Sequence, residues 1–354
     1  MSEHEINYGF STGICAAGAV KACAVFLRYG YVPECVSVKN LEGQIFNLNV
    51  TRRGNMIGII KDSGDDQKHD ITHGIFISAE IKLTGRKGGV KFLAGAGVGT
   101  VTLKGLKIPV GEPAINPIPR IIIKNTVREI FFNDEEIIIT IKIPDGEKIA
   151  RDTFNSRLGI IGGLSILGTT GIVKPMNEAA LLESLSLEMN VIKNLGHEKI
   201  FIAFGHSSAE FLLNEFNLHE SDRNIIQAEN YIGHVIDEAV KLNFTHAVIA
   251  GQPGKLLKVA AGNFQTHNKI SDGRFEALCC HLGIIGAPSE FIKKIYSCNT
   301  TDEAVKIIRD NKFERVWKNL AQAVVNKCNI RVKYKIKFSV YFIDLDGGLL
   351  SCEI

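Results

Sequence analysis

Residues 199–216 read KIFIAFGHSSAEFLLNEF, and this stretch decides the fold of the second half of the chain. The apolar run from Lys199 to Phe204 ends at a glycine, which is typical of a buried strand, and residues 209–216 have the pattern of a helix. The same rhythm continues as a strand at 224–228, a helix at 232–242 and a strand at 246–250. Strands that alternate with helices indicate a parallel sheet with right-handed crossovers. We therefore expect a small α/β, Rossmann-like parallel-sheet domain over residues 195–354.

Further elements are expected on both sides of this core. Helices are predicted at 272–282, 289–295 and 302–325, and a closing hairpin is predicted from strands in 330–343 and 349–353. Another helix begins near Asn177 and precedes the parallel sheet, so the domain boundary is expected near residues 190–196.

The first half of the chain has a different texture. Ser11 and Thr12 are helix-capping residues before a run of small residues that ends at Gly30, so a tightly packed helix is predicted from Thr12. The other expected elements are strands within 35–61 and 75–83, a helix between 118 and 132, and a strand at 136–143. This mixture predicts an α+β domain over residues 1–194.

Length and composition limit the classes of protein. The chain has 354 residues, enough for two domains of roughly 100–200 residues each. Hydrophobic residues make up 45% and charged residues 22%, which supports a core in each domain. Lys and Arg number 41 against 38 Asp and Glu, and this net charge of +3 is far below what a nucleic-acid partner requires.

Cysteine usage and the N-terminus indicate a cytoplasmic protein. The 8 cysteines form no C-x-x-C pair, so reduced and mostly buried thiols are expected. Cys279 and Cys280 are neighbours that would point about 100° apart on a helix, so no metal site is predicted. Residues 1–10 lack the basic and apolar regions of a secretory signal, and the glycine-rich stretch 158–173 is shorter than the roughly 20 residues that span a membrane.

Each predicted strand of the parallel core ends in a loop with glycine and polar side chains. The loops are Gly205-His206-Ser207-Ser208, Glu229-Asn230-Tyr231-Ile232-Gly233 and Gly251-Gln252-Pro253-Gly254-Lys255. Parallel sheets bind ligands at this edge, so the candidate cofactor-binding residues are Gly205, Glu229, Asn230, Gly233, Gly251 and Gly254. Glu229 has the position from which an acidic side chain accepts hydrogen bonds from ribose hydroxyls. The alternative is that glycine and asparagine only form turns there, and the G-x-G-x-x-G fingerprint is absent.

Two stretches of the first half also suggest function. The run Gly95-Ala96-Gly97-Val98-Gly99 precedes a strand pattern and not a helix, so it is interpreted as a flexible loop near a ligand rather than a phosphate loop. Carboxylates cluster in Asp62-Ser63-Gly64-Asp65-Asp66 and Asp70-Ile71-Thr72-His73-Gly74. Grouped carboxylates can accept a proton, so Asp65 and Asp66 are the candidate catalytic residues. The alternative is a set of Asx turns between two strands.

These stretches, taken together, resemble one enzyme family. Besides the carboxylate cluster, the resemblance rests on GFSTG at 9–13, GVG at 97–99, PVGEPAINPIPR at 109–120, NSRLGIIGGLSILGTTG at 155–171, GKLLK at 254–258 and THNKISDGRFE at 266–276. They are similar to the cobalt-precorrin-5B C1-methyltransferase family of anaerobic cobalamin biosynthesis, from about Tyr8 to the last strand.

The resemblance implies a reaction and a fold. S-adenosyl-L-methionine would give a methyl group to C1 of cobalt-precorrin-5B, producing cobalt-precorrin-6A, and cobalt would be present only as part of the substrate. The first domain would be an α+β domain related to the ribosomal S5 domain 2-like fold by circular permutation, and the second a small α/β domain. The chain departs from the family pattern at His206 and Gln252, so neither side chain is a safe candidate for catalysis.

The implied substrate is a small corrin precursor with many acetate and propionate groups, which arginine and lysine are suited to bind. The candidate substrate-binding residues are Arg120, Arg157, Lys255 and Arg274, with Arg151 and Lys174 as further cations. A non-catalytic corrinoid carrier and a nicotinamide-dependent reductase of the same pathway are the alternatives, and the missing glycine fingerprint disfavours the reductase. The sequence does not indicate an oligomeric state.

Overall fold

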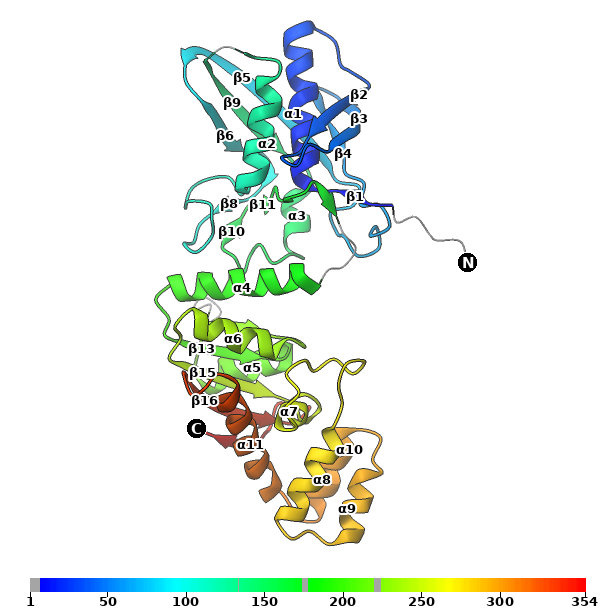
Figure 1. Cartoon of the computed structure of the whole chain (residues 1–354), viewed down its shortest axis with the longest axis vertical. Helices are drawn as coiled ribbons and strands as arrows, with labels where there is room; N and C mark the ends of the chain where they lie inside the picture. The colour runs from blue at the N-terminus through cyan, green and yellow to red at the C-terminus, as the bar shows by residue number, and fades with distance from the viewer. Residues whose placement is uncertain (1–6, 133, 174–177, 220–223) are drawn as a thin grey trace, which may run out of the picture. The chain divides into compact units, whose positions relative to one another are not determined.

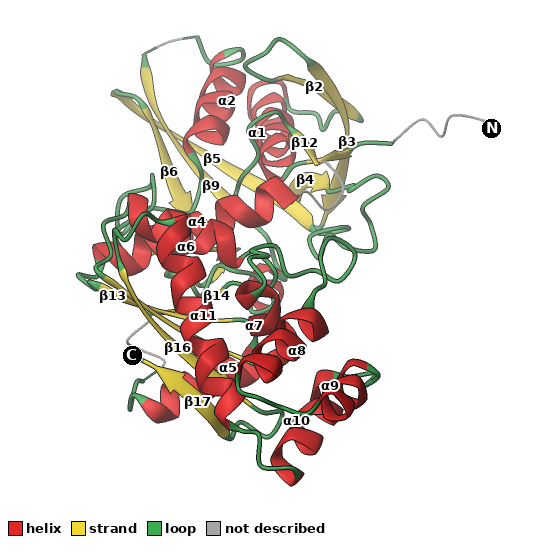
Figure 2. Ribbon diagram, turned by 60° about the horizontal axis from the view of Figure 1, so that its bottom comes forward, coloured by secondary structure: helices red, strands yellow, loops and turns green. Residues whose placement is uncertain are grey.

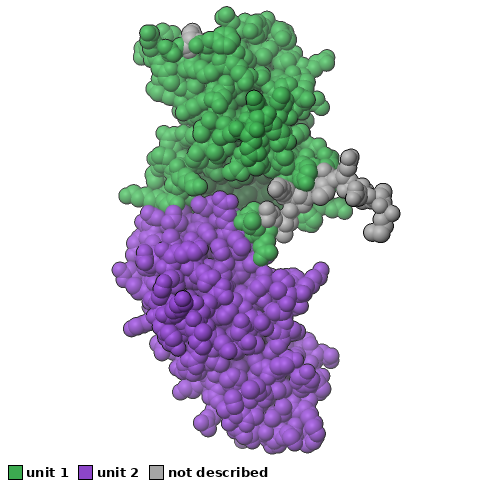
Figure 3. Space-filling view, viewed as in Figure 1, with its two compact units in different colours: residues 1–180 green, residues 181–354 purple. Residues whose placement is uncertain are grey.

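The computed structural model describes residues 7–132, 134–173, 178–219 and 224–354 (Figure 1). Helices and sheets occur in both halves, which confirms the mixed α and β class (Figure 2). Contacts divide the chain into two compact units, residues 1–180 and 181–354 (Figure 3). The division falls in the first turn of helix α4 (Glu178–Asn194) and not at 194/195, because Leu185, Met189 and Ile192 belong to the core of the second unit.

Unit 1 is built on a 6-stranded sheet of order β2-β3-β4-β5-β9-β6, in which only β6 and β9 run parallel. The strands are β2 (Cys35–Lys39), β3 (Ile45–Arg53), β4 (Met56–Ile60), β5 (Phe76–Lys87), β6 (Val90–Ala94) and β9 (Glu135–Lys142). Burial alternates along β2, so the sheet has a packed face and a solvent face. Helices α1 (Thr12–Tyr29) and α2 (Pro117–Arg128) share one core with the packed face.

Helix α1 has the ends that the sequence predicts. The Ser11 hydroxyl accepts a hydrogen bond from the amide of Ile14 at 3.3 Å, and Gly30 ends the helix with φ of 80°. Among the described residues, α1 is the one helix long and apolar enough to cross a membrane, and 61% of it is buried within the protein. This burial explains its apolar composition, because a core helix needs small and apolar side chains all round.

Short strand pairs close one end of unit 1. Strand β1 (Gly9–Phe10) pairs with β12 (Ile172–Val173), β7 (Gly97–Val98) with β11 (Gly163–Leu164), and β8 (Thr100–Val101) with β10 (Ile160–Ile161). Gly97 has φ of 73°, and a Cβ there would lie 1.9 Å from the carbonyl oxygen of Ile143, in the loop before α3 (Gly146–Ala150). The glycine run at 95–99 therefore serves close backbone packing, in place of the flexible ligand loop expected from the sequence.

Unit 2 contains a 5-stranded sheet of order β14-β13-β15-β16-β17. The strands are β13 (Lys199–Ala203), β14 (Ile225–Gln227), β15 (His246–Gly251), β16 (Lys337–Ile343) and β17 (Leu349–Glu353). The first four in the sheet are parallel and β17 is antiparallel to β16. The predicted β-α-β-α-β unit and the closing hairpin are both present.

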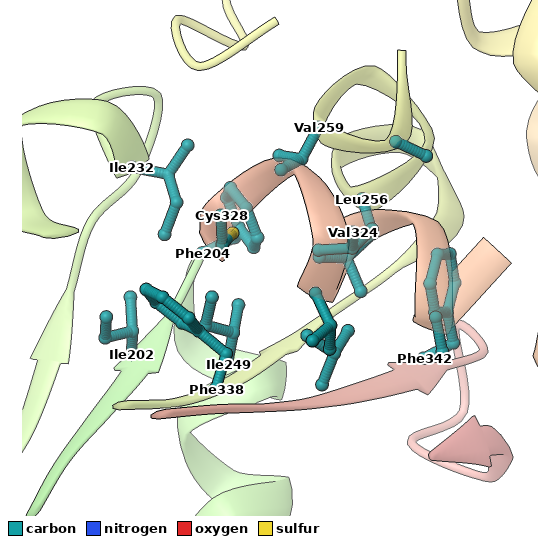
Figure 4. Packing of buried hydrophobic residues seen from close by; sticks show 14 of the residues in the cluster. Ile202, Phe204, Ile232, Ile249, Leu256, Val259, Val324, Cys328, Phe338 and Phe342 are labelled. Atoms are coloured by element: carbon teal, nitrogen blue, oxygen red, sulfur yellow. The ribbon is translucent and has the colours of Figure 1, made fainter. Parts of the chain in front are cut away.

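Helices cover both faces of this sheet. On one face Phe201, Val248 and Tyr341 pack with α5 (His206–Glu215). The opposite face carries the larger core, which includes Ile202, Ile249 and Phe338 (Figure 4). The buried Trp317 belongs to the same core. The helices that contribute to it are α4, α6 (Ile232–Lys241), α7 (Pro253–Ala260), α8 (Arg274–Ile284), α9 (Ser289–Tyr296), α10 (Thr301–Asp310) and α11 (Arg315–Arg331).

The sequence prediction misplaced two boundaries near the C-terminus. The single helix expected at 302–325 is divided into α10 and α11, because Lys312 adopts a left-handed φ of 61°, which a continuous helix does not allow. The first strand of the hairpin begins at Lys337 and not at 330, because α11 continues to Arg331.

We predict that Gly97→Ala destabilises unit 1 by at least about 2 kcal/mol, because the added Cβ meets fixed backbone and the left-handed φ is strained. Gly89→Ala is the matched control, since no atom lies within 4 Å of its Cβ position. That variant is expected to change the free energy of unfolding by less than about 0.5 kcal/mol. Urea unfolding of both variants measures the difference, and equal stabilities would contradict the packing role of Gly97.

Candidate functional site

The carboxyl edge of the unit 2 sheet has the topology of a ligand site. The chain passes from β13 to β14 on one side and then to β15 on the other side of β13. The point between β13 and β15 is therefore a topological switch point, where α/β sheets open a crevice outside the strand ends. Gly205 follows β13 after one residue, and Gly251 is the last residue of β15, so both lie at this edge as expected from the sequence.

Side chains connect the loops at this edge. The amide of Gln252 donates to the hydroxyl of Ser207 at 3.4 Å, and the Lys255 ammonium donates to Oδ1 of Asn230 at 2.5 Å. The backbone amide of Thr266 donates to the carbonyl oxygen of Asn230 at 2.9 Å, which attaches the 265–272 loop to the same edge. The loops after all three strands thus form one connected surface.

The glycines of this edge differ in what the fold requires of them. A Cβ on Gly251 would lie 2.6 Å from the Phe204 ring, and one on Gly233 would lie 2.9 Å from Cβ of Phe264. No atom lies within 4 Å of the Cβ position of Gly205, and that of Gly254 has only an ordinary contact at 3.5 Å. Gly233 and Gly251 are therefore explained by internal packing, whereas Gly205 and Gly254 leave space at the edge for a ligand.

Glu229 combines exposure with backbone strain. It lies in the turn after β14, closed by the amide of Tyr231 donating to Ala228 at 2.7 Å, and has φ of 49°. A left-handed glutamate costs about 1–2 kcal/mol, and such outliers concentrate at functional sites. Its exposed carboxylate stands at the strand end, where the sequence predicted a ribose-binding acid.

Two lysines of α7 belong to this edge. Burial lowers the pKa of Lys255, neighbouring Lys258 lowers it further, and Glu229 raises it. Lys258 is fully buried and donates to the carbonyl oxygens of Thr266 and Ser271, each at 2.9 Å, and to the Asn268 side chain at 2.6 Å. Lys258 therefore fixes the 265–272 loop, and Lys255 lies beside the cofactor candidates although the sequence assigned it to substrate.

A hollow of about 390 Å³ lies beside α5, next to this edge. It is lined by Ser207, the α5 side chains Glu210, Phe211, Asn214 and Glu215, and Leu345 to Gly347. Its carboxylates oppose an anionic ligand, so this hollow is not a site for the carboxylate-rich substrate.

In unit 1, the motifs at 9–13, 62–74, 97–99, 109–120 and 155–171 meet in one place, here called the motif cluster. Phe10 N donates to Asp62 O at 2.7 Å, and Gly13 N donates to Leu167 O at 2.9 Å. Ile166 N donates to Ala114 O at 2.8 Å, and Ala114 N donates to Gly99 O at 2.7 Å. Segments far apart in the sequence therefore share one hydrogen-bonded framework.

A buried ion pair organises the 62–74 loop. Lys61 is 1% exposed, and its ammonium donates to the Asp70 carboxylate and, at 2.7 Å, to the hydroxyl of Ser63. The other Asp70 oxygen accepts from the amide of Thr72 at 2.9 Å. Burial raises the pKa of Asp70, but the hydrogen bonds from Lys61 and Thr72 outweigh it and lower that pKa to about 2.

The two candidate catalytic carboxylates have different surroundings. Asp65 is exposed, and its Oδ2 accepts from the amide of Asn7 at 2.9 Å. Asp66 is 6% exposed, and within the described parts of the chain its Oδ1 has no hydrogen-bond donor; Nδ1 of His69 lies 3.6 Å from it. A buried carboxylate oxygen without a donor is costly, which distinguishes Asp66 from Asp65 as a site for a proton or a ligand.

Comparison with known proteins identifies the family. The CbiD family model matches residues 1–175, and the model of the CbiD C-terminal domain matches residues 265–353. A cobalt-precorrin-5B C(1)-methyltransferase of Thermoanaerobacter sp. strain X514 is 39% identical over 98% of this chain and 95% of its own. The chain belongs to the CbiD family. The resemblance inferred from the motifs is thereby confirmed.

A second curated relative agrees with this membership. A cobalt-precorrin-5B C(1)-methyltransferase of Alkaliphilus metalliredigens is 37% identical over 98% of this chain and 92% of that protein. A solved structure of the cobalamin biosynthesis protein CbiD from Archaeoglobus fulgidus is 27% identical, covers 75% of this chain and 84% of its own, and has a TM-score of 0.39.

The candidate substrate-binding cations of this CbiD protein differ in the groups that their side chains contact. Arg120 donates to the carbonyl oxygens of Ile115 and Pro113 at 2.8 and 3.0 Å and to Glu112 at 3.1 Å, so it braces the 109–117 loop. Arg274 forms a two-point ion pair with Asp272 at 2.8 and 3.0 Å. Arg157 and Arg151 are exposed, and the Arg157 guanidinium lies 5.3 Å from the centre of the Phe154 ring. Lys174 lies outside the described residues.

Sequence reasoning missed Lys61, Ser63 and Lys258 as residues that organise the two candidate sites. Lys61 follows the apolar strand β4 and lies nine positions before Asp70. A buried lysine cannot be told from an exposed one by its residue type alone, so its role was not predicted. The signal that could have identified it is the combination of a lysine ending an apolar run with a dense carboxylate cluster directly after it.

We predict that Asp70→Asn lowers the free energy of unfolding by about 3–5 kcal/mol, because it leaves the Lys61 charge buried without a counter-ion. Lys61→Met combined with Asp70→Asn should recover most of this loss. The pKa of Asp70 falls from 3.8 to about 2 on folding, so its contribution is complete above pH 3.8 and is lost as the pH falls through about 2.

Urea unfolding at neutral pH and at pH values between about 4 and 2 tests this prediction. Asp272 also has a pKa lowered to about 2, chiefly by Arg274, and contributes in the same pH range. The relevant quantity is therefore the difference between wild type and Asp70→Asn, which should shrink as the pH falls. A difference that is small at neutral pH would contradict the ion-pair role.

Proposed function

We propose that this protein transfers a methyl group from S-adenosyl-L-methionine to C1 of cobalt-precorrin-5B, giving cobalt-precorrin-6A in anaerobic cobalamin biosynthesis. The observation that carries the proposal is the 39% identity to a protein of that named activity over 98% of this chain. Cobalt belongs to the substrate, and nucleic acid and membrane are not proposed as partners. A cytoplasmic location follows from the same proposal, in agreement with the free cysteines.

The carboxyl edge of unit 2 fits the methyl donor. The space beside Gly205 and Gly254 allows close approach to the backbone, Glu229 offers an acceptor for ribose hydroxyls, and the Asn230 and Lys255 side chains are polar groups at the same edge. When bound, the donor supplies an electrophilic sulfonium methyl group. In-line transfer breaks the sulfur–methyl bond as the bond to C1 forms, so the protein needs to orient the reactants and exclude water without a covalent intermediate.

The motif cluster fits the corrin precursor. Its loops leave Ile71, Val110, Ile161 and Leu167 about half exposed, from 48% to 57%, although each is a large apolar side chain. Tyr8, which pairs with Gly64 of the cluster, is also 48% exposed. Exposed apolar groups gathered on functional loops are suited to the faces of a macrocycle. Arg157 is the proposed partner of a peripheral carboxylate, because its side chain is exposed within the 155–171 motif. Arg120, Lys255 and Arg274 are the other candidates, and each has a role within the fold through the hydrogen bonds described above.

Asp66 is the proposed acceptor for the proton that leaves the macrocycle. The support is its burial and the Oδ1 atom that has no donor among the described residues. Asp65 is the less suitable candidate, because its carboxylate holds the backbone of Asn7. We also propose the permuted ribosomal S5 domain 2-like topology for unit 1, supported by the mixed sheet that shares its core with α1 and α2.

Methyl transfer measured with labelled S-adenosyl-L-methionine and cobalt-precorrin-5B tests the function directly. Labelled cobalt-precorrin-6A is the expected product. Corrin binding without transfer would indicate the carrier, and consumption of a nicotinamide cofactor with no methylation would indicate the reductase.

We predict that Glu229→Gly weakens binding of S-adenosylhomocysteine about tenfold or more, because a charged hydrogen-bond acceptor contributes about 1.5–3 kcal/mol. Relief of about 1–2 kcal/mol of left-handed strain offsets the flexibility of glycine, so the stability should stay equal or rise. Lys333→Gly is the control, since Lys333 is exposed and left-handed with φ of 53° and lies in the turn before β16, at the amino end of that strand. Calorimetry that showed unchanged affinity in Glu229→Gly would place the donor elsewhere.

For the proton acceptor, we predict that Asp66→Asn slows single-turnover methyl transfer by about a hundredfold or more, the usual size of general-base catalysis. Asp65→Asn should lose less than about tenfold, because asparagine still accepts from the Asn7 amide. Melting temperatures of both variants separate a loss of rate from a loss of fold. Full activity in Asp66→Asn would leave water or the substrate nitrogens as the proton acceptor.

A further inference from the structure

His73 lies at the end of the 62–74 loop, where the chain is held in register on both sides. The amide of Gly74 donates to the carbonyl oxygen of Lys61 at 2.8 Å, and the amide of Lys61 donates to Ile75 at 2.9 Å. This pairing sets the imidazole of His73 against Ser63, whose backbone N–H donates to Nδ1 at 3.1 Å. The side chain of His73 keeps 35% exposure, so one edge of the ring faces outward.

The bond from Ser63 determines where the ring carries its proton. A backbone amide can only donate, so Nδ1 accepts with its lone pair and the neutral imidazole bears hydrogen on Nε2. Within residues 7–132, 134–173, 178–219 and 224–354, no group accepts a hydrogen bond from Nε2. His73 therefore has one nitrogen bonded within the fold, and its Nε2–H is not bonded to another group in these residues.

The Ser63 amide is itself rigidly held. The Ser63 hydroxyl accepts from Lys61 at 2.7 Å and donates to the Asp70 carboxylate at 2.8 Å, and Ser63 is 1% exposed. On its other side, a Cβ on Gly9 would lie 2.2 Å from the Ser63 backbone. The buried Lys61–Asp70 pair thus fixes Ser63, and Ser63 fixes the tautomer of His73.

Asp62 is the acidic group that faces this ring. Its Oδ1 lies 4.0 Å from Nδ1 of His73 and already accepts from the amide of Gly64 at 2.9 Å. A proton on Nδ1 would turn the ring toward Asp62 and would leave the Ser63 amide, which is part of the packed loop, without an acceptor. The geometry favours the ring with hydrogen on Nε2 over that alternative.

We propose that His73 is a substrate-binding residue, whose Nε2–H donates a hydrogen bond to a carboxylate of the tetrapyrrole substrate. The proposal rests on the proposed function for the identity of the substrate. It adds a neutral donor to a site so far defined by cations and apolar side chains. Such a donor gives directional recognition of a carboxylate without a further buried charge.

Two variants of similar shape test the roles of the two His73 nitrogens one at a time. Asparagine retains an acceptor near the position of Nδ1, but its shorter side chain places no donor at the position of Nε2, whereas glutamine places an amide N–H there. We expect His73→Asn to raise the dissociation constant for cobalt-precorrin-5B about tenfold with the melting temperature retained, and His73→Gln to stay within about threefold of wild type. His197→Gln, in the loop before β13, is the control for a histidine outside both sites.

Equilibrium titration followed by the corrin absorbance measures these constants without requiring methyl transfer. Absence of methyl transfer by the wild type would contradict the proposed function. The binding constants test the His73 proposal separately, because they do not depend on methyl transfer. Nitrogen-15 spectra of histidine-labelled protein give an independent readout, and hydrogen on Nε2 of His73 is expected. Any of three results would overturn the proposal. These are unchanged substrate affinity in His73→Asn, equal losses of affinity and of melting temperature in both variants, and hydrogen on Nδ1 of His73.

Discussion

A buried ammonium group needs an anionic partner, and the Lys61–Asp70 pair meets this requirement for the motif cluster of unit 1. Satisfying the Lys61 charge requires the 62–74 loop to fold back over the end of β4. The same pair lies near the first turn of α1, where burial raises the pKa of the Cys15 thiol to about 12 and Lys61 acts in the opposite direction. The loop, the N-terminal strand and the core helix therefore depend on one charge–charge contact.

Unit 2 also holds a loop with a buried lysine, but the interaction is weaker than the ion pair of unit 1. Lys258 is as deeply buried as Lys61, yet its ammonium donates to neutral oxygens of Thr266, Asn268 and Ser271, and no carboxylate of the described residues pairs with it. Burial lowers the pKa of Lys258, while nearby Asp272 raises it. A cation held by neutral acceptors gains less from the interior than an ion pair does, so the 265–272 loop is expected to open more easily than the 62–74 loop.

The sequence predicted the fold wherever local signals decide it. The Ser11 and Gly30 caps defined α1, and the apolar run before Gly205 defined β13, because capping and burial patterns act over a few residues. The break at Lys312 was missed because a left-handed lysine has no local signature. At the candidate site, Arg120 looked like a ligand for substrate carboxylates, but its partners are the Ile115 and Pro113 carbonyls and the Glu112 carboxylate, which the folded loop brings together. Residues whose role depends on distant partners could not be assigned from sequence alone.

Glycines illustrate why a motif needs the structure before it can be interpreted as a site. Gly97, Gly233 and Gly251 would each place a Cβ within 3 Å of another atom, so the fold alone requires glycine at these positions. Gly205 has extended backbone and open space beside it, so neither sterics nor conformation explains the absence of a side chain there. A glycine that the fold does not require, at the switch point of a parallel sheet, is better evidence for a bound ligand than several that it does require. Gly205 and the strained Glu229 therefore support the proposed donor edge more strongly than the number of glycines in the three loops does.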